Sequence, residues 1–216
     1  APSPPHHTMS APQRARHDPE RFDAAYYRRF YGRRGVHDAE RIAHLATGVH
    51  ELAAWWGVRI RSVLDVGCAK GFMLHDMAEL IPGITVKGVD VSEYAIAHAI
   101  DDMKPHVGVA SAVKLPVADK SFDVVIDNPT TLPGWVRNAA QHLKGHTKHY
   151  MFISTESVYA GNATPNADES DPVLPLPAGL DPFAVKAEDA RRTYGPLKAE
   201  AEREVERQYP GINTII

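Results

Sequence analysis

Short β-branched runs alternate with helix-forming segments from residue 62 to the end of the chain, and this alternation constrains the fold most strongly. The runs that we expect to be strands are SVLDVG, TVKGVD, HVGVAS, FDVVID, HYMFIS and NTII. The intervening helices are expected near residues 71–81, 92–103, 133–144 and 186–207. Parallel strands need crossovers that place helices on the faces of the sheet. The pattern therefore predicts an α/β fold, a Rossmann-like doubly wound, mainly parallel sheet with helices on both faces.

The chain length bounds the number of domains. With 216 residues, 44% of them apolar, the chain can bury the core of one medium-sized domain. Residues 1–19, rich in Pro, Ser and His, are expected to be a disordered lead-in, and residues 20–216 a single domain. Within that domain, residues 20–58 should supply N-terminal helices, because HDAERIAHLATGVHELAAWWG has apolar residues three and four apart.

The composition argues against several classes of function. A net charge of −3 disfavours a basic nucleic-acid binder, so we expect a small-molecule partner and no nucleic acid. The single cysteine excludes an internal disulfide and fits a cytoplasmic protein. No apolar run approaches the roughly 20 residues that span a bilayer, so no membrane partner is expected. The 12 histidines lack metal-ligand spacing, so no metal is expected either.

The segment VLDVGCAKG places an acidic residue at the end of a strand and glycines in the turn that follows. Asp65 ends the strand, while Gly67 and Gly71 allow a sharp turn and a close approach of a ligand to the backbone. Asp90 ends the next strand, nineteen residues past Gly71, where a carboxylate can accept hydrogen bonds from both hydroxyls of a ribose. The turn lacks the glycine spacing that seats a pyrophosphate on a helix N-terminus. These residues predict a site for a nucleoside cofactor.

Over about residues 40–127, this pattern and the run LPVADKSFDVVI resemble class I S-adenosylmethionine-dependent methyltransferases, whose motif I has the form D-x-G-x-x-x-G. The resemblance implies S-adenosylmethionine as the cofactor, with residues 60–127 as the cofactor half. It places Asp65 and the two glycines around the methionyl part and Asp90 on the ribose. It also implies four further cofactor-binding positions, namely Cys68, Val91, Ser111 and Asp127.

Some of these positions have a second interpretation. Cys68 lies in the glycine turn, where a lone cysteine is more often a small packing residue than a nucleophile. Ser111 stands where the family often carries an acid that meets the adenine amino group. Asp127 and Asn128 can cap the end of a strand and form a turn, and we favour that role over catalysis.

From about residue 122 to residue 216, the chain is similar to the second half of extended short-chain dehydrogenases/reductases, the NAD-dependent epimerase/dehydratase family. The similarity lies in ISTESVY, a Pro-rich loop over residues 160–185, and YGPLK. Tyr194 and Lys198 share a helix face, so the ammonium can lower a phenol pKa that is ordinarily about 10. The resemblance implies that Thr155, Tyr194 and Lys198 are catalytic, with NAD or NADP as the alternative cofactor. The glycine fingerprint that binds NAD(P) in that family is missing from residues 1–121.

Both families use the strand order 3-2-1-4-5, so the resemblances imply the order 3-2-1-4-5-6 for this chain. Together they predict a chimera, natural or artificial, joined near residues 120–128, with residues 128–216 as the epimerase-like half. We favour a methyltransferase whose methyl acceptor is unknown. An NAD(P)-dependent epimerase or reductase and an inert cofactor-binding chimera stay open. The long loop is expected to be a lid, a substrate loop or disordered. The oligomeric state is open, with a dimer through the helix at residues 186–207 as one alternative. Because the chain starts without Met and ends in GINTII, we also expect a truncated sequence.

Overall fold

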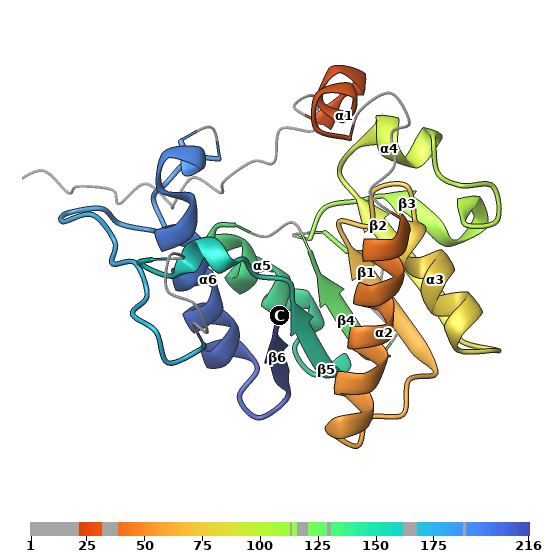
Figure 1. Ribbon diagram of the computed structural model, residues 1–216. Helices are drawn as coiled ribbons and strands as arrows, with labels where there is room; N and C mark the ends of the chain where they lie inside the picture. Colours follow the sequence, from red (N-terminus) through yellow and green to blue (C-terminus); the bar gives the residue numbers. More distant parts are fainter. Residues whose placement is uncertain are drawn as a thin grey trace, which may run out of the picture.

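A sheet of six parallel strands forms the centre of the computed structural model, which describes residues 22–31, 39–112, 114–115, 121–128, 131–161, 168–187 and 189–216. The strand order is β3-β2-β1-β4-β5-β6 (Figure 1). The bounds are β1 Ser62–Val66, β2 Thr85–Asp90, β3 Val107–Val109, β4 Phe122–Asp127, β5 Thr147–Phe152 and β6 Asn213–Ile215. All neighbouring strands pair in parallel. The predicted fold class and strand order are confirmed. The expected lead-in at residues 1–19 lies outside the described residues.

Six α-helices and three short 3-10 helices connect the strands within the described residues. The α-helices are α1 Ala24–Tyr31, α2 Ala39–Trp55, α3 Phe72–Leu80, α4 Glu93–Ala97, α5 Pro133–Leu143 and α6 Tyr194–Gln208. The 3-10 helices are η2 Lys104–His106, η3 Glu156–Val158 and η4 Ala190–Thr193. Of the described helices, none combines the length and apolar character needed to cross a bilayer. No group of three or more side chains suited to a metal ion occurs in the described part of the chain.

Two of the predicted helices have different bounds. The helix expected over residues 92–103 ends at Ala97, and the N–H of Ile100 donates to the carbonyl of Lys70 instead of to its own helix. The helix expected from residue 186 begins at Tyr194 after the η4 turn. Pro196 lies in the first turn of α6, where its missing N–H costs nothing; further inside a helix it would break the hydrogen-bond ladder.

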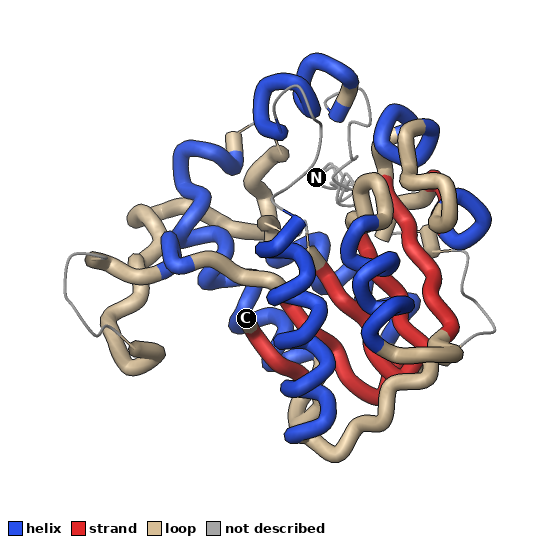
Figure 2. Tube along the Cα trace, turned by 45° about the vertical axis from the view of Figure 1, so that its right-hand side comes forward, coloured by secondary structure: helices blue, strands red, loops and turns tan. Residues whose placement is uncertain are grey.

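The two faces of the sheet are covered by different helices (Figure 2). Side chains alternate along each strand, so that Val63 packs with α2 and α3 whereas Leu64 packs with α5 and α6. Strand β4 is buried along its whole length. Each face of the sheet is therefore covered by an apolar layer. The polar side chains at the carboxyl ends of the strands lie where these two layers end.

Asp123 fastens the opposite, amino end of β4. Its carboxylate accepts hydrogen bonds from the N–H groups of Arg61, at 2.8 Å, and Ser62, at 3.0 Å, and forms an ion pair with Lys148 at 2.6 Å. Burial alone would raise the pKa of Asp123, but these partners lower it below its usual value. This acid therefore holds β1 beside β4 and has a structural role.

The start of α6 packs directly on the turn that follows β5. A Cβ atom added to Gly195 would lie 2.0 Å from the carbonyl oxygen of Ser157 and 3.2 Å from Leu174 Cδ1. No side chain fits there, because the nearest atom belongs to backbone. This contact fixes where α6 begins relative to β5, and with it the position of Lys198 one turn later.

We expect the Gly195→Ala variant to lose roughly 1–3 kcal/mol of unfolding free energy, because the backbone of α6 or η3 must move apart. Chemical denaturation followed by circular dichroism measures the loss. Gly48→Ala is the matched control, since a Cβ at Gly48 in α2 meets nothing within 4 Å. That variant should be neutral or stabilised by up to ~1 kcal/mol through helix propensity. Equal stability of the two variants would contradict the packing described.

Candidate functional site

Three aspartates lie at the carboxyl ends of adjacent strands. Asp65 is in β1, Asp90 ends β2 and Asp127 ends β4, and these strands are neighbours in the sheet. Asp65 and Asp127 are 1% and 0% exposed, and Asp90 is half-buried. Like charges at this burial repel one another strongly because little water screens them. The structure thus brings together the three acids that the sequence predicted for a cofactor site.

Asp65 is the most strongly perturbed of the three acids. Burial, and then the charges of Asp90 and Asp127, raise its pKa to about 7. Its Oδ1 atom is buried and has no hydrogen-bond partner in the described part of the structure. An unsatisfied buried acceptor is costly. A donor brought by a ligand, above all a cationic one, would satisfy this oxygen and stabilise the ionised carboxylate.

The glycine turn after β1 is held in place by β2. The N–H groups of Gly67 and Cys68 both donate to the carbonyl of Val89, at 2.7 and 3.1 Å. Three residues of the turn have positive φ, namely Gly67 at 81°, Ala69 at 47° and Gly71 at 86°. Only glycine adopts this conformation without strain, which explains two of the three residue types.

Asp90 stabilises the strained Ala69. Its Oδ2 accepts the N–H of Ala69 at 2.8 Å, and its Oδ1 accepts the N–H of Ser92 at 2.8 Å. Burial raises the pKa of Asp90, while these N–H groups act in the opposite direction. A carboxylate oxygen has two lone pairs, so both oxygens keep acceptor capacity for ribose hydroxyls. Asp90 can therefore shape the turn and bind a ligand together.

Cys68 packs into the core beneath the turn. A Cβ at Gly88 in β2 would lie 2.7 Å from Cys68 Sγ and 2.6 Å from Leu74 Cδ1, so the thiol fills the space that this glycine leaves. Burial raises the pKa of the thiol far above its ordinary value. The structure supports packing as the role of the side chain, so a cofactor contact by Cys68 would have to come from its backbone. Sequence analysis missed Gly88, which stands in the middle of a strand without an apparent turn to explain it.

Two other predicted cofactor positions lie beside this turn. Val91 is half-buried between Asp90 and Ser92. Ser111 is half-buried after β3, where it forms an isolated antiparallel bridge with Lys114. Ser92, which the sequence analysis did not single out, is fully buried and caps α4 by accepting the N–H of Ala95 at 3.0 Å. A serine directly before a helix is a common N-cap, so its sequence context could have identified it.

Helix α1 docks against α4 and the glycine turn. The sequence did not predict this contact. The hydroxyl of Ser92 donates to the carbonyl of Phe22 at 2.5 Å. The rings of Tyr27 and Tyr94 lie 5.5 Å apart, and Lys70 Nζ lies 5.7 and 5.8 Å from their centroids. In Figure 1, α1 accordingly lies beside α4. The N-terminal helix therefore belongs to the surroundings of the site.

The second half of the chain adds a lysine to the same end of the sheet. Lys198 of α6 is 2% exposed, and its Nζ lies 4.1 Å from the ring centroid of Phe152. Burial lowers its pKa to about 8, although Asp127 and Glu202 attract its charge. The hydroxyl of Tyr150 donates to Asp127. Asp127 therefore interacts both with the acids of the first half and with the lysine of the second.

The other two residues predicted to be catalytic are Tyr194, on the same helix as Lys198, and Thr155, in the turn after β5. Tyr194 is the first residue of α6, 39% exposed, one turn before Lys198. Thr155 follows β5, and its hydroxyl caps η3 by accepting the N–H of Ser157 at 3.2 Å. The hydroxyl of the neighbouring Ser154 donates to Glu202. Glu202 was not predicted, and its charge acts on Lys198.

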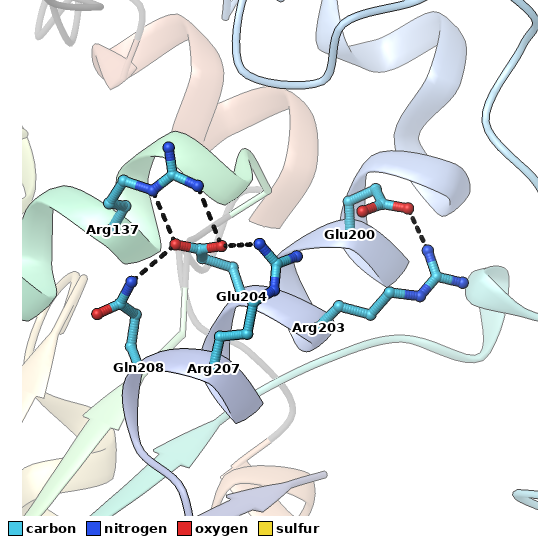
Figure 3. A network of polar contacts seen from close by, with 6 residues as sticks. All are labelled: Arg137, Glu200, Arg203, Glu204, Arg207 and Gln208. Atoms are coloured by element: carbon cyan, nitrogen blue, oxygen red, sulfur yellow. Dashed lines mark hydrogen bonds and ion pairs between the residues drawn. The ribbon is translucent and has the colours of Figure 1, made fainter.

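A buried acid on the outer side of α6 has a purely structural environment. Glu204 accepts hydrogen bonds from Arg137 Nε at 2.8 Å and Gln208 at 2.9 Å and pairs with Arg207 at 2.6 Å (Figure 3). The guanidinium of Arg137 also lies 3.9 Å from the ring centroid of Phe183 in the long loop. These contacts fasten α6 to α5 and to the described part of the loop. The partners of Glu204 satisfy its charge, whereas Asp65 keeps an unsatisfied oxygen.

Residues 61–158 match the family model described as a methyltransferase domain. The match covers less than half of the chain, runs from the start of β1 to η3 and includes all three aspartates. It agrees with the methyltransferase resemblance of about residues 40–127. The match also continues beyond residue 127, into the part of the chain whose sequence resembles an epimerase.

Two curated proteins align with part of the chain. An uncharacterised protein of Haemophilus influenzae is 38% identical over 82 residues, 34% of this chain and 32% of that protein. The malonyl-[acyl-carrier protein] O-methyltransferase of Hahella chejuensis is 35% identical over 72 residues, 32% of this chain and 25% of that protein. The chain thus spans a third or less of the length of these relatives.

Among solved structures, the plantazolicin methyltransferase BpumL, in complex with a pentazolic desmethylPZN analog and SAH, has a TM-score of 0.50 at 16% identity. The alignment covers 85% of this chain and 68% of BpumL. At this identity the likeness shows the fold. The matches give no support to an epimerase-like half or to a chimera, and both stay predictions.

The buried thiol predicts slow alkylation. In the native protein at pH 8, Cys68 should resist iodoacetamide, because it is 5% exposed and burial raises its pKa. Mass spectrometry after timed quenching measures the labelled fraction. The same protein in urea is the control and should label completely within minutes. Equal rates in the two states would show that the thiol is accessible and would revive its nucleophilic interpretation.

Asp65 predicts a stability that depends on pH. Because its pKa is raised from 3.8 to about 7 in the folded state, the folded protein holds this proton more tightly than the unfolded chain. The unfolding free energy should therefore fall as the pH rises through this window, by up to ~4 kcal/mol from this group. Asp65→Asn should remove that decline. Urea unfolding of both proteins at pH 5 and pH 8 samples ~3 kcal/mol of this decline, and parallel pH dependence would contradict the prediction.

Proposed function

We propose that this chain binds S-adenosylmethionine at the carboxyl ends of β1, β2 and β4 and acts as a methyltransferase on a small-molecule acceptor. The methyltransferase-domain match, the O-methyltransferase among the relatives and the SAH-bound fold neighbour support the proposal. The observation that carries it is Asp65, a buried acid with an unpartnered oxygen directly before the glycine turn.

The charges of the cofactor suit this end of the sheet. S-adenosylmethionine carries two positive charges, on its sulfonium and its α-ammonium, and one carboxylate. The ammonium is a donor for Asp65 Oδ1, and the net positive charge relieves the repulsion among Asp65, Asp90 and Asp127. A dinucleotide would instead bring a diphosphate toward the same three carboxylates. Electrostatics therefore favours the sulfonium nucleoside.

The residues of the turn and of β2 have separate tasks in this proposal. Gly67 and Gly71 leave room for the methionyl part, and Asp90 accepts the ribose hydroxyls while it holds the turn through Ala69. When bound, the cofactor supplies an electrophilic methyl group. The chain then contributes mainly orientation, by holding the acceptor in line with that methyl group near Asp127. A single domain over residues 20–216 and a cytoplasmic location are part of the same proposal.

An NAD(P)-dependent epimerase or reductase is the second candidate. Tyr194 and Lys198 lie one turn apart on α6, and Lys198 is buried beside Asp127 at the end of the sheet. A lysine there can assist acid/base chemistry by a phenol. However, the hydroxyl of Thr155 caps η3, and the acids near the glycine turn repel a diphosphate. The placement of Tyr194 and Lys198 on α6 favours this function, but it does not explain the three aspartates and the glycine turn.

Calorimetric titration with S-adenosylmethionine, S-adenosylhomocysteine, NAD and NADP tests the proposal. We expect heat from the first two ligands and none from the others. Asp90→Ala should weaken binding by on the order of 100-fold, because hydrogen bonds to a charged acceptor are worth roughly 1.5–3 kcal/mol each. Asp101→Ala is the control, since Asp101 is exposed and forms a surface ion pair with Lys104 at 2.6 Å. Heat from NAD or NADP alone would support the second candidate, and silence with all four would support an inert or misassembled fold.

A further inference from the structure

Lys198 is a buried cation that the proposed cofactor site does not use. It projects from α6 to the carboxyl ends of β4 and β5, where Phe152 contacts its ammonium and Asp127 attracts it. Asp127 in turn raises the pKa of Asp65 and accepts the hydroxyl of Tyr150. The ammonium is therefore linked, through one shared carboxylate, to the acids that would receive the positive charges of the cofactor.

The charged groups around Lys198 come from several elements. Asp127 of β4 and Glu202 of α6 are the acids that act on it. Ser154, after β5, donates its hydroxyl to Glu202. Glu204, the other buried acid of α6, is paired with Arg137 of α5 and with Arg207. The balance at Lys198 is thus set mainly by its burial against two nearby carboxylates.

We propose that Lys198 is a positioning residue that distinguishes the sulfonium form of the cofactor from its thioether product through the charge on sulfur. The inference rests on the proposed function. A sulfonium near Asp127 repels the ammonium, so binding of S-adenosylmethionine drives the proton of Lys198 into solvent. S-adenosylhomocysteine has a neutral sulfur, so Lys198 keeps its proton. With the neutral sulfur of the product, Asp127 attracts the charged ammonium as it does without ligand.

The physical basis is competition between two cations for one carboxylate. At the effective dielectric of a protein site, two unit charges repel by about 4 kcal/mol at 4 Å, and the repulsion falls in inverse proportion to their distance. Burial lowers the pKa of Lys198 to about 8, so this repulsion can remove its proton near neutral pH. At lower pH the protonated lysine should weaken binding of the sulfonium relative to the thioether. At higher pH the neutral amine should remove that penalty.

The test measures dissociation constants of S-adenosylmethionine and S-adenosylhomocysteine by calorimetry at pH 6.5 and pH 9. In the wild type, the ratio of the first constant to the second should fall by ~10-fold or more as the pH rises. In Lys198→Met this change should be absent, since Met keeps the length and the contact with Phe152 without a charge. The α-amino groups of the ligands titrate equally in both proteins, so the difference between proteins isolates Lys198.

A second measurement counts protons. Titrations at pH 7.5 in buffers of different ionisation enthalpy should show that the wild type releases more protons with S-adenosylmethionine than Lys198→Met does, and that the two proteins agree with S-adenosylhomocysteine. Circular dichroism and thermal unfolding verify that the variant folds. Lys198→Gln, neutral and polar, replaces it if Met does not fold.

The outcomes separate this inference from the proposed function. If both ligands bind and the pH dependence of the ratio is the same in wild type and neutral variants, the role of Lys198 is wrong and the cofactor proposal stands. If neither ligand binds the wild type, both proposals fail. A pH-dependent ratio that the neutral variants lose supports the inference.

Discussion

Three parallel strands of the sheet end in aspartates, and the burial of those carboxylates governs the chemistry of this end of the molecule. Strand pairing fixes β1 between β2 and β4, and the charges of Asp90 and Asp127 on these flanking strands both act on Asp65. Each outer acid has protein partners. Asp90 accepts two backbone N–H groups, and Asp127 accepts the hydroxyl of Tyr150 and attracts Lys198. Asp65 keeps one oxygen without a partner and has its pKa raised to about 7. Of the three acids, Asp65 on the central strand β1 thus gains most from a positively charged partner.

The C-terminal elements determine how much positive charge the protein itself supplies near these aspartates. Gly195 allows α6 to pack on the backbone of η3, and Glu204 fastens the same helix to α5 through Arg137. With α6 held at both places, Lys198 is directed into the end of the sheet and lies over Phe152. Glu204 and Asp127 are both fully buried acids. The first has three polar partners that hold α6 in place, whereas the second shares its charge between the protein and the proposed ligand.

The strands and the three acids were predictable because they depend on local patterns, whereas the strand order was implied by the family resemblances. The sequence did not predict contacts between distant segments. The pairing of Cys68 with Gly88, the capture of the Ile100 N–H by Lys70 and the docking of α1 through Ser92 depend on the folded chain. The same limit applies to Lys198. Its helical spacing from Tyr194 was visible, but its neighbours Asp127 and Phe152 lie on β4 and β5, whose placement the spacing does not reveal.

The electrostatics of the site extends across the boundary that the sequence resemblances suggested near residues 120–128. Asp127 stands at that boundary and interacts with Asp65 on one side and with Lys198 on the other. The methyltransferase-domain match likewise continues to residue 158. Whatever the origin of the two parts, the ionisation of Asp65 in the first and of Lys198 in the second both depend on Asp127. In our proposal the acids of the first part receive the positive charges of the cofactor, and the lysine of the second part competes with those charges for Asp127. The ionisation of Lys198 and the charge of a bound cofactor must therefore be treated as one coupled equilibrium.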